Sequence, residues 1–241
     1  MEKKQFENKN FVLYAPDSLK HVFKNLEEVL YETLEVYKDL FNVDDFKKIS
    51  IYYFDDLDKF RNCVYELRGE KDSLPKYANG VFDGDKIIAY IDPNIKESDP
   101  LFNKRVHMAS HELFHIMYRE LVINKTHQER FTWFDEGCAQ FFSGEKEYEM
   151  HEGFSEWFSK VKSETKTIPE LNNLTHGDEF KNDNYNGYDL SLLAVKNLYE
   201  RLGPIGFKRV FVDSNRIYDY GLDVLKQAFL FYGVQTGIIR K

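Results

Sequence analysis

The apolar and polar positions in the N-terminal half predict strands that alternate with helices. Phe11–Tyr14 and Ile49–Phe54 are short apolar runs rich in β-branched and aromatic residues, which is typical of strands. From Leu19 to Leu40 apolar residues recur every three or four positions, so we expect an amphipathic helix covering one face of a sheet. A second helix is expected from about Asp56 to Leu67. The order is therefore strand, helix, strand, helix.

A hairpin is expected next, between Asn79 and Asp92. Asp83-Gly84 is a favoured two-residue turn, which makes Ile87–Ile91 the second strand of the hairpin. If this strand lies at the edge of the sheet, an extended peptide could pair with it. The equally weighted alternative is an ordinary edge strand that charged residues protect.

The C-terminal half predicts helices. Thr132 followed by Asp135 is a capping-box pattern, so a helix should begin at Trp133 and end at Gly144. Residues 145–183 are charged and irregular apart from one short helix. Four helices are expected after Gly144: Phe154–Val161, Leu190–Leu202, about Gly206–Val212 and about Leu222–Tyr232. Gly203-Pro204 should end the second of them.

One stretch carries metal-binding chemistry. His111-Glu112-Leu113-Phe114-His115 has the form His-Glu-x-x-His, a zinc-binding signature. Residues four apart lie one turn apart on a helix, so both imidazoles can bind one ion. Glu112 then lies beside the ion, where it can act as a general base. Apolar residues at helical spacing around the motif predict a buried helix, which Asp99-Pro100 should begin.

This helix has two other interpretations. The histidines could be ordinary core residues with satisfied hydrogen bonds. His107 lies one turn before His111, so three histidines on one helix could also be the ligands. One straight helix cannot easily surround an ion, however, so His107 is expected to be a supporting or core residue.

A catalytic zinc ion usually has three protein ligands and one open position. Glu136, which follows His115 by 21 residues on a separate helix, is the candidate for the third ligand. The segment Trp133–Phe141 resembles the Trp-x-x-Glu-Gly-x-Ala-x-Tyr/Phe segment of gluzincin metallopeptidases. Together with the His-Glu-x-x-His motif, the chain most resembles the bacterial peptidase-MA-like family of that clan.

This resemblance implies an α+β, zincin-like fold. Residues 1–123 would form a mixed sheet-and-helix lobe that ends in the zinc helix, and residues 124–241 a helical lobe. The implied zinc ligands are His111, His115 and Glu136, with Glu112 as general base. Tyr188 begins a segment that resembles a Tyr-x-x-Ser-x-x-x-Val segment of these proteins, which implies a hydroxyl that hydrogen-bonds the oxyanion. Tyr185 is the nearest alternative.

The chain also departs from the thermolysin-like pattern. Those gluzincins carry an aspartate four residues after the ligand glutamate, where it orients the first histidine, but here that position is Gln140. A carboxamide is a weaker acceptor for an imidazole N–H, and Asp135 is the second candidate for this role. His176 could serve as an oxyanion histidine, although a solvated loop histidine is the favoured interpretation.

Composition and charge indicate which binding partners and which cellular location to expect. The net charge of −8 and the lack of a basic stripe argue against nucleic acid. No apolar run approaches the roughly 18 residues that a membrane-spanning helix needs. The charged start does not resemble a secretory signal, so we expect a cytoplasmic protein, or a sequence without its leader. The two cysteines, Cys63 and Cys138, are expected to be buried thiols rather than a disulfide scaffold.

The leading hypothesis is a zinc-dependent metallopeptidase that acts on a peptide or protein. One alternative is a non-catalytic peptide- or protein-binding module on a zincin scaffold. A zinc hydrolase with a non-peptide substrate is the other, and it would use the same residues. The sequence gives no indication of the oligomeric state or of the cleavage specificity.

Overall fold

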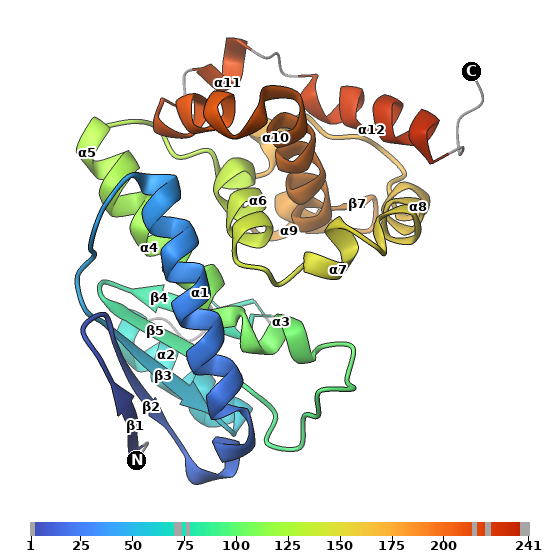
Figure 1. Cartoon of the computed structure of the whole chain (residues 1–241). Helices are drawn as coiled ribbons and strands as arrows, with labels where there is room; N and C mark the ends of the chain where they lie inside the picture. Colours follow the sequence, from blue (N-terminus) through green and yellow to red (C-terminus); the bar gives the residue numbers. More distant parts are fainter. Residues whose placement is uncertain (1–2, 70–73, 76–77, 214–215, 220–222, 237–241) are drawn as a thin grey trace. The chain divides into compact units, whose positions relative to one another are not determined.

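A computed structural model describes residues 3–69, 74–75, 78–213, 216–219 and 223–236 of the chain (Figure 1). The protein combines a mixed sheet with many helices, which confirms the α+β prediction. The chain forms two compact units, of which the first comprises residues 1–117 and 142–145. The second comprises residues 118–141 and 146–241, so its start lies six residues before the predicted lobe boundary. No helix within the described ranges is long and apolar enough to cross a membrane.

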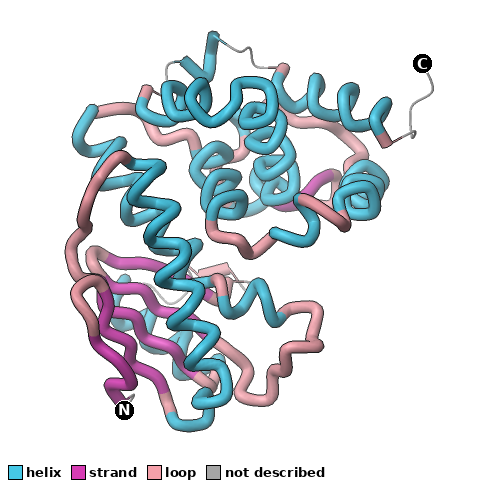
Figure 2. Tube along the Cα trace, viewed as in Figure 1, coloured by secondary structure: helices cyan, strands magenta, loops and turns pink. Residues whose placement is uncertain are grey.

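The first unit contains a five-stranded sheet in the order β1-β2-β3-β5-β4. The outer pairs, β1 with β2 and β4 with β5, are antiparallel, and the two inner pairings are parallel. Figure 2 shows these strands side by side, whereas the second unit is helical apart from a short ribbon. The strands span Lys3–Glu7 (β1), Phe11–Ala15 (β2), Ile49–Phe54 (β3), Gly80–Asp83 (β4) and Lys86–Tyr90 (β5).

Helices connect the parallel strands, as parallel pairing requires. The predicted helix from Leu19 to Leu40 is confirmed, but its start is a 3₁₀ turn, η1 (Asp17–Val22), which leads into α1 (Phe23–Phe41). The second predicted helix is α2 (Leu57–Arg68), where the Asp56 side chain accepts the backbone N–H of Lys59. In Figure 1, α1 and α2 lie on opposite faces of the sheet, so the central strands are buried on both sides.

Two details of the predicted hairpin are wrong. Asp83 pairs with Lys86, so the turn is Gly84-Asp85, with Gly84 at a φ of 60° that favours glycine. The predicted edge strand is also internal, because β5 pairs with β3 on one side and with β4 on the other. Gly80–Asp83 therefore forms this edge of the sheet, and Ile87–Ile91 has no free edge for a peptide.

The motif lies on a helix that is buried on all sides. The preceding α3 (Phe102–Val106) begins two residues later than Asp99-Pro100 predicts, because the Asp99 side chain accepts the N–H of Lys96 in a turn instead. The motif helix is α4 (Met108–Tyr118), and its Ser110 carbonyl accepts the Tyr37 hydroxyl of α1 at 3.0 Å. A π-helical turn, η2 (Arg119–Ile123), and the short α5 (Asn124–Thr126) follow.

The second unit is built mainly from helices. The helix after α5 starts at Thr132 rather than Trp133, and the Phe131 carbonyl accepts the N–H groups of Phe134 and Asp135. Residues 145–183 are more regular than expected. The elements are α6 (Thr132–Phe142), α7 (Glu147–Met150), α8 (Phe154–Glu164), η3 (Leu171–Asn173), α9 (Gly177–Phe180), β6 (Lys181–Asn182), β7 (Tyr185–Asn186), α10 (Gly187–Val212), α11 (Arg216–Asp219) and α12 (Val224–Gln235).

The predicted break at Gly203-Pro204 is confirmed within α10. Gly203 has a φ of 65° and a ψ of 172°, which no α-helix contains, so two helical segments meet at a kink there. The segment after the kink corresponds to the helix expected at Gly206–Val212. The last helix begins at Val224, and its predicted start at Leu222 lies outside the described residues.

Candidate metal centre

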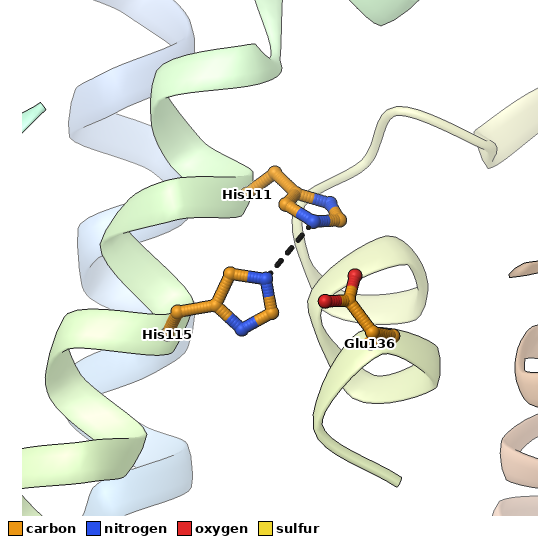
Figure 3. Close-up of side chains that lie close together, drawn as sticks. All are labelled: His111, His115 and Glu136. Atoms are coloured by element: carbon orange, nitrogen blue, oxygen red, sulfur yellow. Dashed lines mark hydrogen bonds between the residues drawn. The ribbon is translucent and has the colours of Figure 1, made fainter. Parts of the chain in front are cut away.

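His111 and His115 bring two ring nitrogens together on α4. Their Nε2 atoms lie 3.1 Å apart, and their rings meet nearly edge to face (Figure 3). The residues are only 8% and 4% exposed. Two ligands of a tetrahedral zinc ion with bonds of about 2.05 Å lie about 3.3 Å apart. The helical spacing therefore produces the pair of donor atoms that the motif predicts.

Side chains of the first unit hold these rings. Phe82 of β4 stacks against His115, with ring centroids 5.8 Å apart and an interplanar angle of 29°. On the neighbouring face of α4, Phe114 packs edge-on against Tyr37 at 5.5 Å. The His115 ring and the motif helix are thus fixed by packing, and an ion bound there would require little reorganisation of His115.

Glu136 joins the two histidines in the only group of this kind found among the described residues. One ligand atom from each of His111, His115 and Glu136 lies within 4.8 Å of the others (Figure 3). Two imidazoles and one carboxylate are the donor set of many catalytic zinc sites, so the residues present fit such an ion. Within the second unit, Arg130 Nη2 lies 3.9 Å from Glu136 Oε1 and is a competing partner for this carboxylate.

Glu112 follows His111 directly and is buried in the first unit, with 7% of its surface exposed. Gly80, the first residue of β4, lies against it. A Cβ at position 80 would stand 3.0 Å from Glu112 Oε1 and 2.5 Å from Met108 Cγ. On β3, burial raises the pKa of Tyr53, and the nearby charge of Glu112 raises it further. Because Gly80 has no side chain, the Glu112 carboxylate can occupy the space beside β4.

Tyr188 lies in the first turn of α10. Its ring packs against Phe180 at 4.7 Å, and its backbone carbonyl accepts the Gln140 side chain at 2.9 Å. The alternative, Tyr185, donates its hydroxyl to the Glu179 carbonyl at 3.0 Å, which occupies that hydroxyl within the second unit. The oxyanion role of Tyr188 stays a prediction.

The residues expected to orient His111 have other contacts in the second unit. Gln140 donates to the carbonyls of Tyr188 and Glu136, and the Asp135 carboxylate binds Arg130 Nε at 2.5 Å. In the first unit, the Glu145 Oε2 atom lies 3.5 Å from His111 Nδ1. No sequence pattern marks Glu145, since it lies beyond the helix end at Gly144 and belongs to no motif.

The two other candidate histidines, His107 and His176, have different surroundings. His107 Nδ1 contacts the Ser143 carbonyl at 2.5 Å, so this ring supports the loop after α6. His176 is exposed, as the interpretation of a solvated loop residue requires. Neither residue belongs to the group of His111, His115 and Glu136 that could hold a metal ion.

Comparison with known proteins does not assign a family or a function to this chain. Neither the models of known protein families nor the curated proteins give a match to this chain. A functional assignment therefore depends on the motif, on the chemistry of its side chains and on the grouping of His111, His115 and Glu136.

Proposed function

We propose that this protein is a zinc-dependent metallopeptidase of the gluzincin type. The observation that carries the proposal is the grouping of His111, His115 and Glu136, whose ligand atoms lie within 4.8 Å of one another. The pair of helices in the resemblance, one with His-Glu-x-x-His and one with Glu-Gly, corresponds to α4 and α6. The mixed sheet followed by helices supports a zincin-like fold as part of the same proposal.

The proposed chemistry assigns a separate task to each side chain. His111, His115 and Glu136 would hold the zinc ion, which when bound polarises the substrate carbonyl and makes water acidic enough to react near neutral pH. Glu112 accepts the proton of the attacking water and delivers it to the leaving nitrogen. The Tyr188 hydroxyl donates a hydrogen bond to the oxygen that becomes negative, a stabilisation greater in the transition state than in the substrate.

The burial of Glu112 supports its role as the base. A carboxylate with 7% of its surface exposed is screened weakly by water, so its charge acts strongly on a nearby proton. A protein that only bound peptides would not require this carboxylate beside the two histidines. The complete set of Glu112 and the three metal-binding residues therefore favours catalysis over the binding module.

The test combines metal analysis with an activity screen on the same samples. Zinc content and hydrolysis of a mixed peptide library are measured for wild type, for Glu136→Ala and for Glu147→Ala, which changes an exposed glutamate of α7. The proposal predicts one zinc per wild-type and Glu147→Ala chain, with chelator-sensitive cleavage. Glu136→Ala should bind zinc at least about tenfold more weakly and lose activity.

Other results would contradict the proposal in distinct ways. Zinc binding without any peptide cleavage would favour the non-peptide hydrolase. Peptide binding without zinc would favour the binding module. Wild-type levels of zinc and cleavage in Glu136→Ala would remove Glu136 from the ligand set.

A further inference from the structure

The Glu145 carboxylate lies beside Nδ1 of His111, the ring nitrogen that does not face His115. His111 Nε2 is directed to His115 Nε2 at 3.1 Å, while His111 Nδ1 lies 3.5 Å from Glu145 Oε2. The two ring nitrogens of an imidazole point in different directions, so a carboxylate at Nδ1 is not on the side where Nε2 would bind an ion. Glu145 is therefore placed to orient the ring and not to be a ligand.

We propose that Glu145 is the positioning residue of His111, holding the ring in the form with the proton on Nδ1 and the lone pair on Nε2. A neutral imidazole carries one N–H, and the carboxylate can only accept a hydrogen bond, so the contact favours the proton on Nδ1. The Nε2 lone pair is then available to an ion. This inference rests on the proposed function, because an oriented lone pair is useful only if His111 is a ligand.

Contacts from α3 fix the backbone that carries Glu145. Asn103 donates its side-chain amide to the carbonyls of Gly144 and Glu145, at 3.0 and 3.1 Å. His107 Nδ1 lies 2.5 Å from the Ser143 carbonyl, and since a carbonyl only accepts, His107 is the donor. The loop of residues 143–145 is thus attached at each of its carbonyls, all within the first unit.

Gly144 is the residue that allows this loop to turn. Its φ of 81° favours glycine, and a Cβ there would stand 2.8 Å from His107 Cε1. The chain can therefore leave α6, pass beside His107 and direct Glu145 back towards α4. A larger residue at position 144 would displace both the loop and the carboxylate.

Burial makes the Glu145 carboxylate effective. Its side chain is 2% exposed and that of His111 is 10% exposed, so water screens the contact only weakly. An isolated carboxylate in such a place is unfavourable, and an imidazole N–H beside it, made more acidic when the other nitrogen binds a cation, offsets that cost. The carboxylate and the ion then stabilise the same ring orientation.

The experiment compares Glu145→Gln with Glu147→Gln, an exposed glutamate two residues further along the chain. Zinc affinity is measured by competition with a chromophoric chelator, and thermal unfolding is followed to confirm that each variant folds. Glu145→Gln keeps the side-chain shape but removes the charge, so the zinc dissociation constant should rise about 10- to 100-fold. Glu147→Gln should keep the wild-type value within about twofold.

A second measurement needs no metal. Long-range ¹H–¹⁵N spectra of the metal-free chain at pH 8 report which nitrogen of His111 carries the proton. We expect the Nδ1–H form in wild type and in Glu147→Gln. In Glu145→Gln, the fraction of His111 in the Nε2–H form should be larger than in wild type. A wild-type spectrum with the Nε2–H form would overturn the role of Glu145 even if Glu145→Gln did not fold.

The two proposals fail differently. Wild type with the Nε2–H form of His111, or Glu145→Gln with unchanged tautomer and zinc affinity, would overturn the role of Glu145 and leave the metallopeptidase proposal standing. Wild type that binds no zinc but shows the Nδ1–H form would overturn the proposed function, while the orienting contact itself would be supported.

Discussion

Gly80 lies so close to Glu112 that a methyl group on its Cα would stand 3.0 Å from Glu112 Oε1. The same methyl group would meet the Met108 side chain at 2.5 Å, so one of the two side chains must move in Gly80→Ala. A small displacement of a general base lowers the rate far more than it lowers stability. We expect kcat to fall about 10- to 100-fold, with a loss of about 1–2 kcal/mol in the free energy of unfolding.

Gly69→Ala is the matched control for this prediction. Gly69 has a φ of 71°, but its added Cβ would meet no atom within 4 Å. Its cost is backbone strain of about 1 kcal/mol, without any effect on the site. Comparison of kcat and thermal unfolding in both variants separates the two effects. Gly80→Ala that lost no more activity than Gly69→Ala would show that Glu112 tolerates the methyl group.

Local patterns predicted most of the first unit. Phe11–Tyr14, Ile49–Phe54 and the two connecting helices were found because apolar periodicity reports burial of one element at a time. The position of β5 depends on which strands pair across the sheet, which no short pattern contains. The near-continuous apolar run from Ile87 to Ile91 is typical of an internal parallel strand, and that signal could have corrected the prediction.

In the candidate site, too, local patterns predict some residues, whereas the tertiary fold alone brings in the others. His111 and His115 follow from helix geometry, because residues four apart must be neighbours. Gly80 and Glu145 reach the site from β4 and from the loop after α6, and only the tertiary fold brings such segments to α4. A lone glycine or glutamate in the sequence gives no signal of that approach.

Replacement of Glu112 by glutamine tests the proposed proton transfer. The side chain keeps its volume but can no longer accept a proton, so hydrolysis should fall by at least about 100-fold. Zinc content should remain within about twofold of wild type, because Glu112 lies outside the ligand group. Steady-state kinetics and elemental analysis on the same samples check both parts. Full activity in Glu112→Gln would exclude the glutamate as the general base.

Tyr188→Phe tests the predicted oxyanion contact. The ring packing on Phe180 and the backbone contact with Gln140 do not need the hydroxyl, so the variant should fold normally. If the hydroxyl stabilises the transition state, kcat should fall about 10- to 1,000-fold with little change in KM. Tyr185→Phe is the control, since the Tyr185 hydroxyl donates to a backbone carbonyl. Equal kinetics in the two variants would argue against a role for Tyr188.

Gly137 of α6 lies directly against α10 in the second unit. A Cβ there would stand 2.5 Å from the Ser191 carbonyl oxygen and 2.7 Å from Val195. Backbone cannot retreat as a flexible side chain can, so Gly137→Ala should lower the free energy of unfolding by about 2–4 kcal/mol. Gly206→Ala, which meets only the Leu202 side chain, should change it by less than about 1 kcal/mol. Denaturant unfolding of both variants measures the difference.

The two cysteines should differ in reactivity. Cys138 on α6 is fully buried, and burial followed by the nearby charge of Asp135 raises the pKa of its thiol well above the usual value. The reactive form is the thiolate, which forms only as the pH approaches the pKa, so Cys138 should stay unreactive at pH 8. Cys63 on α2 is partly exposed and should react. Titration with a thiol-specific disulfide reagent should therefore count one thiol in the native protein and two after denaturation. Cys63→Ser should leave no reactive thiol in the native state, and rapid modification of that variant at pH 8 would show that α6 opens to solvent.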